Sequence, residues 1–254
     1  MPHSASPVIV VSHRRSGTHL ALDLLHHNFE YALPYASLKA LDARCETAHK
    51  AAAIARVTAT SELYKAHCHA DFGSYYADPR VASLLDDRIR DSHIVYVMRD
   101  AKDTLTSLFF HARRNGETRA RDANEFVREP ASDRVPKTLR GLNRAEYCEY
   151  HRRSWYAASI KLRILIIRYE RLIGDYRAVV NEVGSFVGRS PKGTTVDVRR
   201  AATNAPGASS SIRSTAVDFR RGIVGDYANY LNISTAAYVD QIQQRMSLTT
   251  EKAQ

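Results

Sequence analysis

Four short apolar runs along the chain predict buried β-strands. They lie at residues 7–12, 62–67, 93–98 and 162–168, and the last of them is the most apolar. Continuous apolar runs of this length, separated by helical segments, are typical of a parallel sheet that is covered on both faces.

Helical patterns follow most of these runs, at residues 18–29, 102–115 and 176–187. In the last segment four valines recur at helical spacing, and Gly188 follows them as a terminator. The alternation of strands and helices predicts the α/β class, with a central parallel sheet flanked by helices.

The remaining segments fit one domain over residues 1–254. Residues 115–140 carry five arginines and predict an exposed excursion, whose simplest meaning is a solvated surface. Residues 205–211 have the composition of a linker and predict a mobile loop over a site. Residues 232–254 are expected to form a C-terminal helix or tail.

Composition and charge narrow the class of partner. Hydrophobic residues make up 44% of the 254 residues and charged residues 25%, which is ordinary for a folded protein. The formal net charge of +10 favours anionic ligands and leaves nucleic acid, an anionic membrane surface and a polyphosphorylated cofactor open.

The three cysteines, Cys45, Cys68 and Cys148, form neither a paired disulfide framework nor a CxxC metal site. A reducing compartment is therefore the simpler interpretation, and we expect no metal. The N-terminus lacks the features of a signal peptide, and no stretch approaches the roughly 20 apolar residues of a membrane span. We expect a cytoplasmic protein.

A polar turn follows the first strand and has the features of a phosphate site. Arginines open the turn, and a helix begins near Gly17 and Thr18. Its first backbone N–H groups and positive dipole end would face an anion. The turn lacks the lysine of the Walker pattern. A well-capped strand–turn–helix unit without a ligand remains the alternative.

A second candidate anion site follows the strand at 93–98. Arg99 leaves the carboxyl end of that strand, where ligands bind in open α/β sheets, and Ser107 lies two helical turns further on. The alternative is that Arg99 pairs with Asp100 or Asp103 at the start of the helix.

These motifs resemble the cytosolic-type sulfotransferases, which use 3′-phosphoadenosine 5′-phosphosulfate (PAPS) and have a P-loop-like architecture. Residues 15–19 (RSGTH) and 96–107 resemble the two cofactor signatures of that family, and 65–67 (KAH) its strand-end Lys-x-His. Residues 168–172 (RYERL) and 219–227 (FRRGIVGDY) resemble two later motifs. The resemblance covers about residues 8–231.

The resemblance assigns roles to individual residues. His67 would be the general base, with His69 as the alternative, and Lys65 and Arg15 would stabilise the transferring group. The implied catalytic set is His67, Lys65, Arg15 and Ser107. The implied cofactor-binding set is Arg15, Ser16, Gly17, Thr18 and His19 at the 5′ phosphosulfate, Arg99, Ser107, Arg220, Arg221 and Gly222 at the 3′ phosphate, and Tyr169 and Thr203, with Asn204, at the adenine.

Three departures from the family pattern stand out. Arg15 replaces a lysine, His19 replaces a threonine, and Leu20 replaces the tryptophan that stacks on adenine. Arginine stabilises charge but cannot donate a proton near neutral pH. The segment after Leu231 has no clear copy of the family's dimer motif, so we predict no oligomeric state.

The sequence therefore predicts a sulfotransferase that moves the sulfuryl group of PAPS to a hydroxyl or amine, leaving adenosine 3′,5′-bisphosphate (PAP). The acceptor would be a small molecule, a lipid or a sugar. We expect no nucleic-acid partner, no transmembrane segment and no metal. A nucleotide-dependent kinase or other phosphoryl transferase on a related fold is the alternative, and a basic nucleic-acid module is a weaker one.

Overall fold

The structure is a computed structural model that describes residues 6–31, 35–38, 61–75, 78–131, 135–198 and 222–251. In this part of the chain, five strands form one sheet in which every neighbouring pair is parallel. The order is β2-β3-β1-β4-β5, with bounds β1 Val8–Ser12, β2 Ala36–Leu38, β3 Leu63–Ala66, β4 His93–Met98 and β5 Ile164–Arg168. The α/β class and the four predicted strands are confirmed, and β2 is an unpredicted edge strand.

The strands run in register, so their carboxyl ends lie at one edge of the sheet. Val11 of β1 pairs with Ala66 of β3 and with Tyr96 of β4. Met98 at the end of β4 pairs with Arg168 at the end of β5. Because the candidate functional residues directly follow these strands, the register gathers them at this carboxyl edge.

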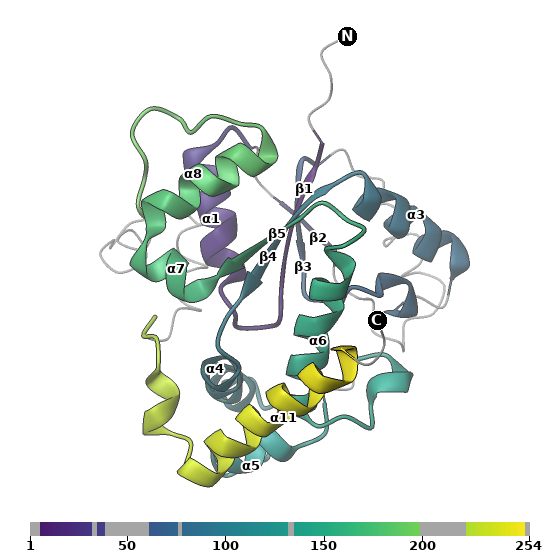
Figure 1. Cartoon of the computed structure of the whole chain (residues 1–254), viewed down its shortest axis with the longest axis vertical. Coiled ribbons are helices and arrows are strands. Elements are labelled where there is room, and N and C mark those ends of the chain that lie inside the picture. The colour runs from purple at the N-terminus through teal and green to yellow at the C-terminus, as the bar shows by residue number, and fades with distance from the viewer. Residues whose placement is uncertain are drawn as a thin grey trace.

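Helices cover both faces of the sheet (Figure 1). One face carries α1 (Thr18–Asn28), α7 (Tyr169–Gly174) and α8 (Tyr176–Val187), and the other carries α3 (Pro79–Arg90) and α6 (Arg144–Ala158). Side chains of β1 alternate between the two cores: Val8 and Val10 pack toward α1 and α8, Ile9 and Val11 toward α3 and α6.

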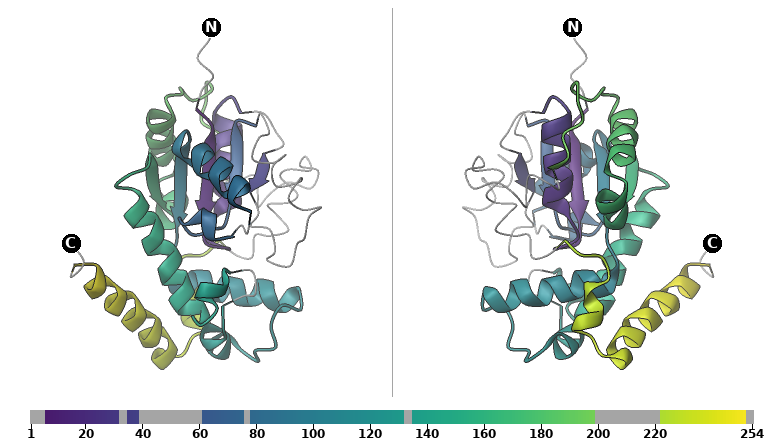
Figure 2. Two further views of the ribbon diagram at one scale, coloured as in Figure 1. Left: turned by 90° about the vertical axis from the view of Figure 1, so that its right-hand side faces the viewer. Right: turned by 90° about the vertical axis from the view of Figure 1, so that its left-hand side faces the viewer.

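A third group of helices lies beneath the carboxyl edge (Figure 2). It consists of α4 (Ala101–Arg114), α5 (Ala123–Arg128) and α11 (Ile233–Glu251), which share an apolar cluster with part of α6. Short 3₁₀ turns lie at Phe72–Tyr75, Lys137–Leu139 and Asp226–Asn229. Among the described residues, no helix combines the length and apolarity needed to cross a bilayer.

The predicted helices are confirmed to within one residue at each end, and Gly188 ends α8 with a φ of 67°. The expectation for residues 115–140 is wrong in part. Arg119, Arg121, Arg128 and Arg140 are exposed, but the segment also contains α5, in which Phe126 and Val127 are fully buried. Because the segment is charged overall, its composition gave no sign that these two apolar side chains would be buried. Residues 205–211 lie outside the described residues.

Candidate active site

The loop between β1 and α1 has the backbone geometry of an anion site. Arg15 adopts a left-handed conformation, with a φ of 71°, which is uncommon for a residue with a side chain. Gly17 has a φ of 105°, and a Cβ there would lie 2.6 Å from a ring carbon of Tyr169. Only glycine fits this position without displacing the tyrosine.

The N-terminus of α1 has no side-chain cap and no acidic residue in its first turn. Its positive end is therefore not neutralised by a neighbouring carboxylate of the helix. The loop is fixed by hydrogen bonds between Ser12 Oγ and Thr18 Oγ1 and, at 3.3 Å, between Ser16 Oγ and Thr104 Oγ1. The backbone N–H of Ser16 donates to the His13 carbonyl (3.2 Å), so it serves the loop itself.

The end of β3 brings Lys65 and His67 to this loop. Lys65 Nζ lies 2.8 Å from His19 Nε2. His67 Nδ1 lies 3.0 Å from the carbonyl oxygen of Ser12, which can only accept. Nδ1 therefore carries the proton, and Nε2 is the basic nitrogen of a neutral imidazole. Enclosure of the ring and the Lys65 ammonium lower the pKa of His67 to about 3.

His69 has a different environment from His67. It is 1% exposed, its Nε2 lies 3.3 Å from Ser74 Oγ, and its ring packs edge-on against Tyr150. Burial lowers its pKa to about 4. His67 is the partly exposed member of the pair.

Arg99 lies at the end of β4, as predicted, and joins three segments of the chain. Its guanidinium donates to the backbone carbonyls of Arg15 (3.4 Å) and Ile223 (3.2 Å) and lies 4.4 Å from the centre of the Tyr169 ring. The ion pair with Asp103 that the sequence left open is also present, at 3.8 Å. Asp100 instead caps α4 through two backbone N–H groups.

The buried carboxylate of Asp103 holds the segment that begins at Gly222. Its oxygens accept from the backbone N–H groups of Gly225 (2.7 Å) and Tyr227 (3.0 Å). This fixes Ile223, two residues earlier, beside Arg99. Sequence analysis assigned Asp103 only an alternative role, although its position four residues after Arg99 on a helix was a usable signal.

The structure brings most of the predicted site residues together. Arg15 Nε donates to Ser107 Oγ (3.4 Å), which connects the first loop to α4. Tyr169 is 3% exposed because it packs between Gly17 and Arg99. Gly222 is among the described residues and has a φ of 65°. The other four predicted residues, Thr203, Asn204, Arg220 and Arg221, lie outside the described residues.

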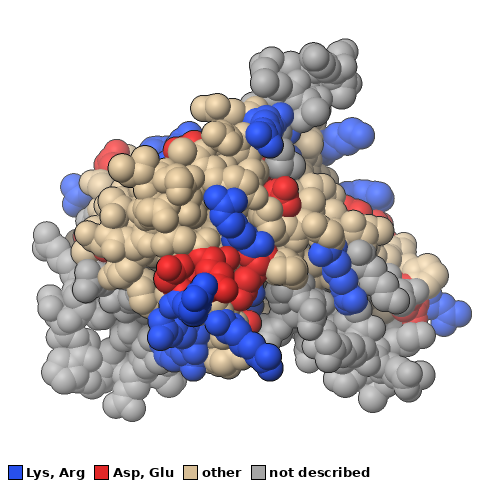
Figure 3. Space-filling model, turned by 90° about the horizontal axis from the view of Figure 1, so that it is seen from below, with Lys and Arg blue, Asp and Glu red and all other residues tan. Residues whose placement is uncertain are grey.

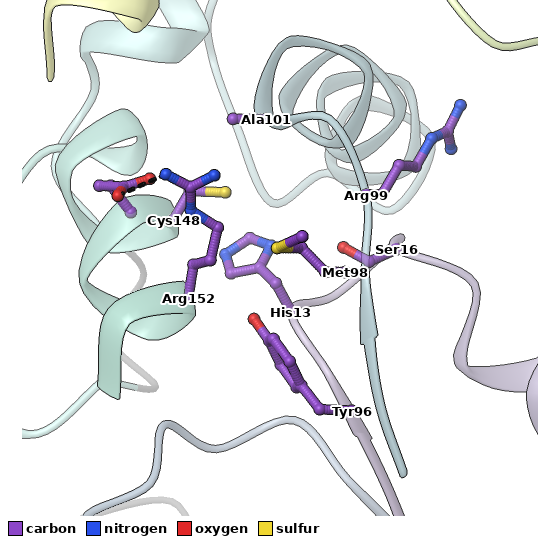
Figure 4. A pocket seen from close by; sticks show the side chains of 9 residues that line it. His13, Ser16, Tyr96, Met98, Arg99, Ala101, Cys148 and Arg152 are labelled. Atoms are coloured by element: carbon purple, nitrogen blue, oxygen red, sulfur yellow. Dashed lines mark hydrogen bonds and ion pairs between the residues drawn. The ribbon is translucent and has the colours of Figure 1, made fainter. Parts of the chain in front are cut away.

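A small cavity beside the loop, lined by both polar and apolar side chains, was not predicted (Figure 4). Its volume of about 10 Å³ suits one water molecule, and it lies between His13, Tyr96 and the α6 residues Cys148 and Arg152. Figure 4 shows Arg99 pointing away from Arg152. Burial lowers the pKa of His13 to about 4.

The ring of His151, in α6, packs edge-on against the ring of His13. Its Nδ1 is 3.1 Å from the Tyr96 hydroxyl, and its ring centre is 5.4 Å from that of His13. Burial, followed by the nearby His13, holds its pKa well below the usual value. Neutral imidazoles therefore line the protein side of the loop. No sequence motif marked them, because His13 directly follows β1 and His151 comes from α6.

The fold defines an α/β protein with a parallel sheet flanked by helices, and the candidate site residues gather at the carboxyl edge of that sheet. The sulfotransferase domain model matches residues 5–252, and the chain belongs to the sulfotransferase family. No curated protein matches this chain in sequence.

Solved structures agree with the fold. A mouse sulfotransferase, SULT7A1, complexed with PAP is 17% identical, with a TM-score of 0.66 over 94% of this chain and 83% of its own. A retinol dehydratase in complex with androsterone and the inactive cofactor PAP is 16% identical, with a TM-score of 0.63 over 96% and 81%. The sulfotransferase domain of a Synechococcus olefin synthase is 12% identical, with a TM-score of 0.52 over 97% of each chain.

Proposed function

We propose that this protein transfers the sulfuryl group of PAPS to a hydroxyl or amine of a small-molecule, lipid or sugar acceptor and releases PAP. The observation that carries the proposal is the meeting of Lys65 and His67 with the uncapped N-terminus of α1 at one edge of the sheet. Family membership and the PAP complexes of two relatives of similar fold support the choice of cofactor.

The 5′ phosphosulfate would lie over the β1–α1 loop. The backbone of residues 17–19 and the positive end of α1 would bind the phosphate. Arg15 and Lys65 would stabilise the charge that develops on the bridging oxygen as its bond to sulfur breaks. Arg15 stays protonated throughout, so its role is electrostatic.

The 3′ phosphate would lie at Arg99 and Ser107. Arg99 presents a forked donor group that suits phosphate oxygens, and Ser107 Oγ is already within hydrogen-bonding distance of Arg15. Gly222, with Arg220 and Arg221, would close over this phosphate. Tyr169, with Thr203 and Asn204, would contact the adenine. Tyr169 also packs on Gly17 and so supports the loop.

The chemistry needs a base and charge stabilisation. His67 Nε2 would take the proton of the acceptor as the acceptor oxygen or nitrogen bonds to sulfur and the bond from sulfur to the phosphate oxygen breaks. In the free protein, enclosure and Lys65 disfavour the imidazolium. The negative charge of the bound cofactor would raise the basicity of the ring. The cationic groups supply the field that this step requires, so the proposal includes no metal.

Cys68 and Cys148 are buried and in no disulfide, which suits a reducing compartment, and we propose that the protein acts in the cytoplasm. The competing nucleic-acid module would require a continuous basic surface. On the described part of the face formed by α4, α5 and α11, acidic side chains lie among the basic ones (Figure 3). Ion pairs such as Arg121–Glu125 and Arg144–Glu129 also join basic to acidic side chains in the described part of the chain.

The test is transfer of labelled sulfate from PAPS to a panel of phenols, alcohols, sugars and amines, with titration of PAP by calorimetry. We expect saturable PAP binding and labelled product with at least one acceptor class. Magnesium-dependent ATP binding in place of PAP binding would favour the phosphoryl transferase. Steeply salt-dependent DNA binding without PAP binding would favour the nucleic-acid module.

A further inference from the structure

The contact between Lys65 and His19 joins strand β3 of the sheet to helix α1, which covers one face of the sheet. His19 is the second residue of α1, and Lys65 is the third residue of β3, which pairs with β1. Their nitrogens are 2.8 Å apart. A lysine ammonium only donates hydrogen bonds, so His19 Nε2 is the acceptor and the histidine ring is neutral.

The surroundings of this pair favour the same arrangement. A second positive charge in the first turn of α1 would be unfavourable, because the N-terminus of a helix is already positive. The ring of Tyr35, just before β2, lies 6.3 Å from the His19 ring and 6.0 Å from Lys65 Nζ. The flexible four-carbon stem of Lys65 therefore ends between an acceptor and an aromatic ring.

We infer that His19 is a positioning residue, which holds the Lys65 ammonium beside the N-terminus of α1. This inference rests on the proposed function, since that is where the bridging oxygen of the cofactor would lie. Lys65 reaches the loop from β3 on a flexible four-carbon stem, and an unrestrained lysine would spend less time at the reacting group. His19 thus acts through Lys65, and its own contribution to cofactor binding is small.

Two substitutions separate positioning from packing. His19→Gln keeps a neutral acceptor near the place of Nε2, whereas His19→Leu keeps bulk without an acceptor. His27→Leu, at the other end of α1, is the matched control. We expect His19→Leu to lower kcat about 10-fold or more, with the Kd for PAP within about threefold of the original protein. His19→Gln should recover most of kcat, and His27→Leu should leave both values unchanged.

A second measurement does not depend on activity. Lys65 of the free protein is acetylated with a limiting N-hydroxysuccinimide ester and quantified by mass spectrometry against the exposed Lys161. Loss of the acceptor should raise the relative labelling rate of Lys65 severalfold in His19→Leu, but not in His19→Gln, because the hydrogen bond stabilises the unreactive ammonium.

Unchanged labelling in His19→Leu, or a loss of PAP affinity as large as the loss of kcat, would overturn the inference. If the original protein neither binds PAP nor transfers sulfate while labelling behaves as expected, the proposed function fails but the contact stands. If the original protein transfers sulfate normally, but the His19 variants change neither the labelling rate of Lys65 nor kcat, only the positioning role fails.

Discussion

The two sides of the candidate active site differ in which protein groups contact their charged groups. On the 5′ side (residues 12–19 with Lys65 and His67), the backbone shapes the loop and the end of α1 has no side-chain cap. On the 3′ side (Arg99, Asp103, Ser107 and residues 222–227), Arg99 is already held by a buried carboxylate and two carbonyls.

This difference separates two tasks. Under the proposed function, a preformed 3′ side would bind its phosphate with little rearrangement, because the protein has already restricted Arg99. The 5′ side keeps a neutral imidazole, a lysine and a helix end near one another, which would suit the proposed transfer of charge between groups. We therefore expect substitutions on the 5′ side to affect kcat and substitutions on the 3′ side to affect cofactor affinity.

The largest effect should come from His67→Asn on the 5′ side. The asparagine amide can still donate to the Ser12 carbonyl, but the basic nitrogen is lost. We expect kcat to fall by roughly 10²–10⁴ with PAP affinity nearly unchanged, measured by sulfate transfer and calorimetry.

His69→Asn is the matched control for that change, because His69 is the other histidine at the end of β3. It should retain more than a tenth of the activity if its fold is intact by thermal melting. A greater loss of kcat in His69→Asn than in His67→Asn would reverse the assignment of the base.

Arg99→Ala should have the next largest effect, on the 3′ side. Removing a charged hydrogen-bonding group should weaken PAP binding roughly 10- to 100-fold. Adenosine 5′-monophosphate lacks the 3′ phosphate, so its affinity should change much less. Arg119→Ala, at an exposed arginine, is the control.

Equal losses for the two nucleotides would show that Arg99 does not read the 3′ phosphate. Because Arg99→Ala also leaves Asp103 without its ion pair, thermal melting must accompany the titration. Arg99→Lys keeps the charge without the fork and should show an intermediate affinity.

Asp103→Asn should give a smaller effect on the same side. A neutral amide replaces the ion pair to Arg99 and one of the two acceptors for the backbone of residues 225 and 227. We expect PAP to bind roughly 3- to 10-fold more weakly, because the loss of order outweighs the removal of a negative charge.

Asp240→Asn is the comparison variant, since Asp240 also pairs with α4, but through Lys102 (2.6 Å) and not through Arg99. It should leave PAP affinity unchanged. Tighter PAP binding by Asp103→Asn would mean that repulsion between the carboxylate and the phosphate outweighs the ordering of Arg99 by Asp103. That result would contradict a preformed 3′ side.

Sequence patterns predicted much of the fold because buried parallel strands are apolar on both faces. The runs in β1, β4 and β5 have this property, and their register at the carboxyl edge follows from the class. β2 was missed because three residues give no pattern. α6 was also missed, although its capping box at Asn143 and Glu146 was a usable signal.

Sequence motifs predicted only those parts of the site that lie at the ends of strands. The positions of Arg99, Ser107, Lys65 and His67 follow from strand ends. The contact of Lys65 with His19 does not, because it depends on side-chain conformations 46 positions apart. The neutral histidines were likewise hidden, since burial among other rings, rather than local sequence, sets the pKa values of His13 and His151.

The smallest effect at working pH concerns these histidines, which gather near the 5′ side. The pKa values of His13, His67 and His69 are lowered from 6.5 to about 4, 3 and 4 in the folded protein. As the pH falls from 6.5 toward 4, the unfolded chain binds protons that the folded chain does not, so stability is lost over this window. Above pH 6.5 this contribution is fully present and stability should be flat with respect to these groups.

Melting temperatures measured from pH 7.5 to 4.5 should therefore fall below pH 6.5, by roughly 2–4 °C for each kcal/mol lost in a chain of this size. His151→Gln removes one of the depressed imidazoles and should make the decline shallower. Hydrogen exchange at pH 5.5 should rise first in residues 12–19 and only later in residues 222–227, because the lowered histidines lie on the 5′ side. A melting temperature that rises on acidification, or exchange that begins on the 3′ side, would contradict this division of the site.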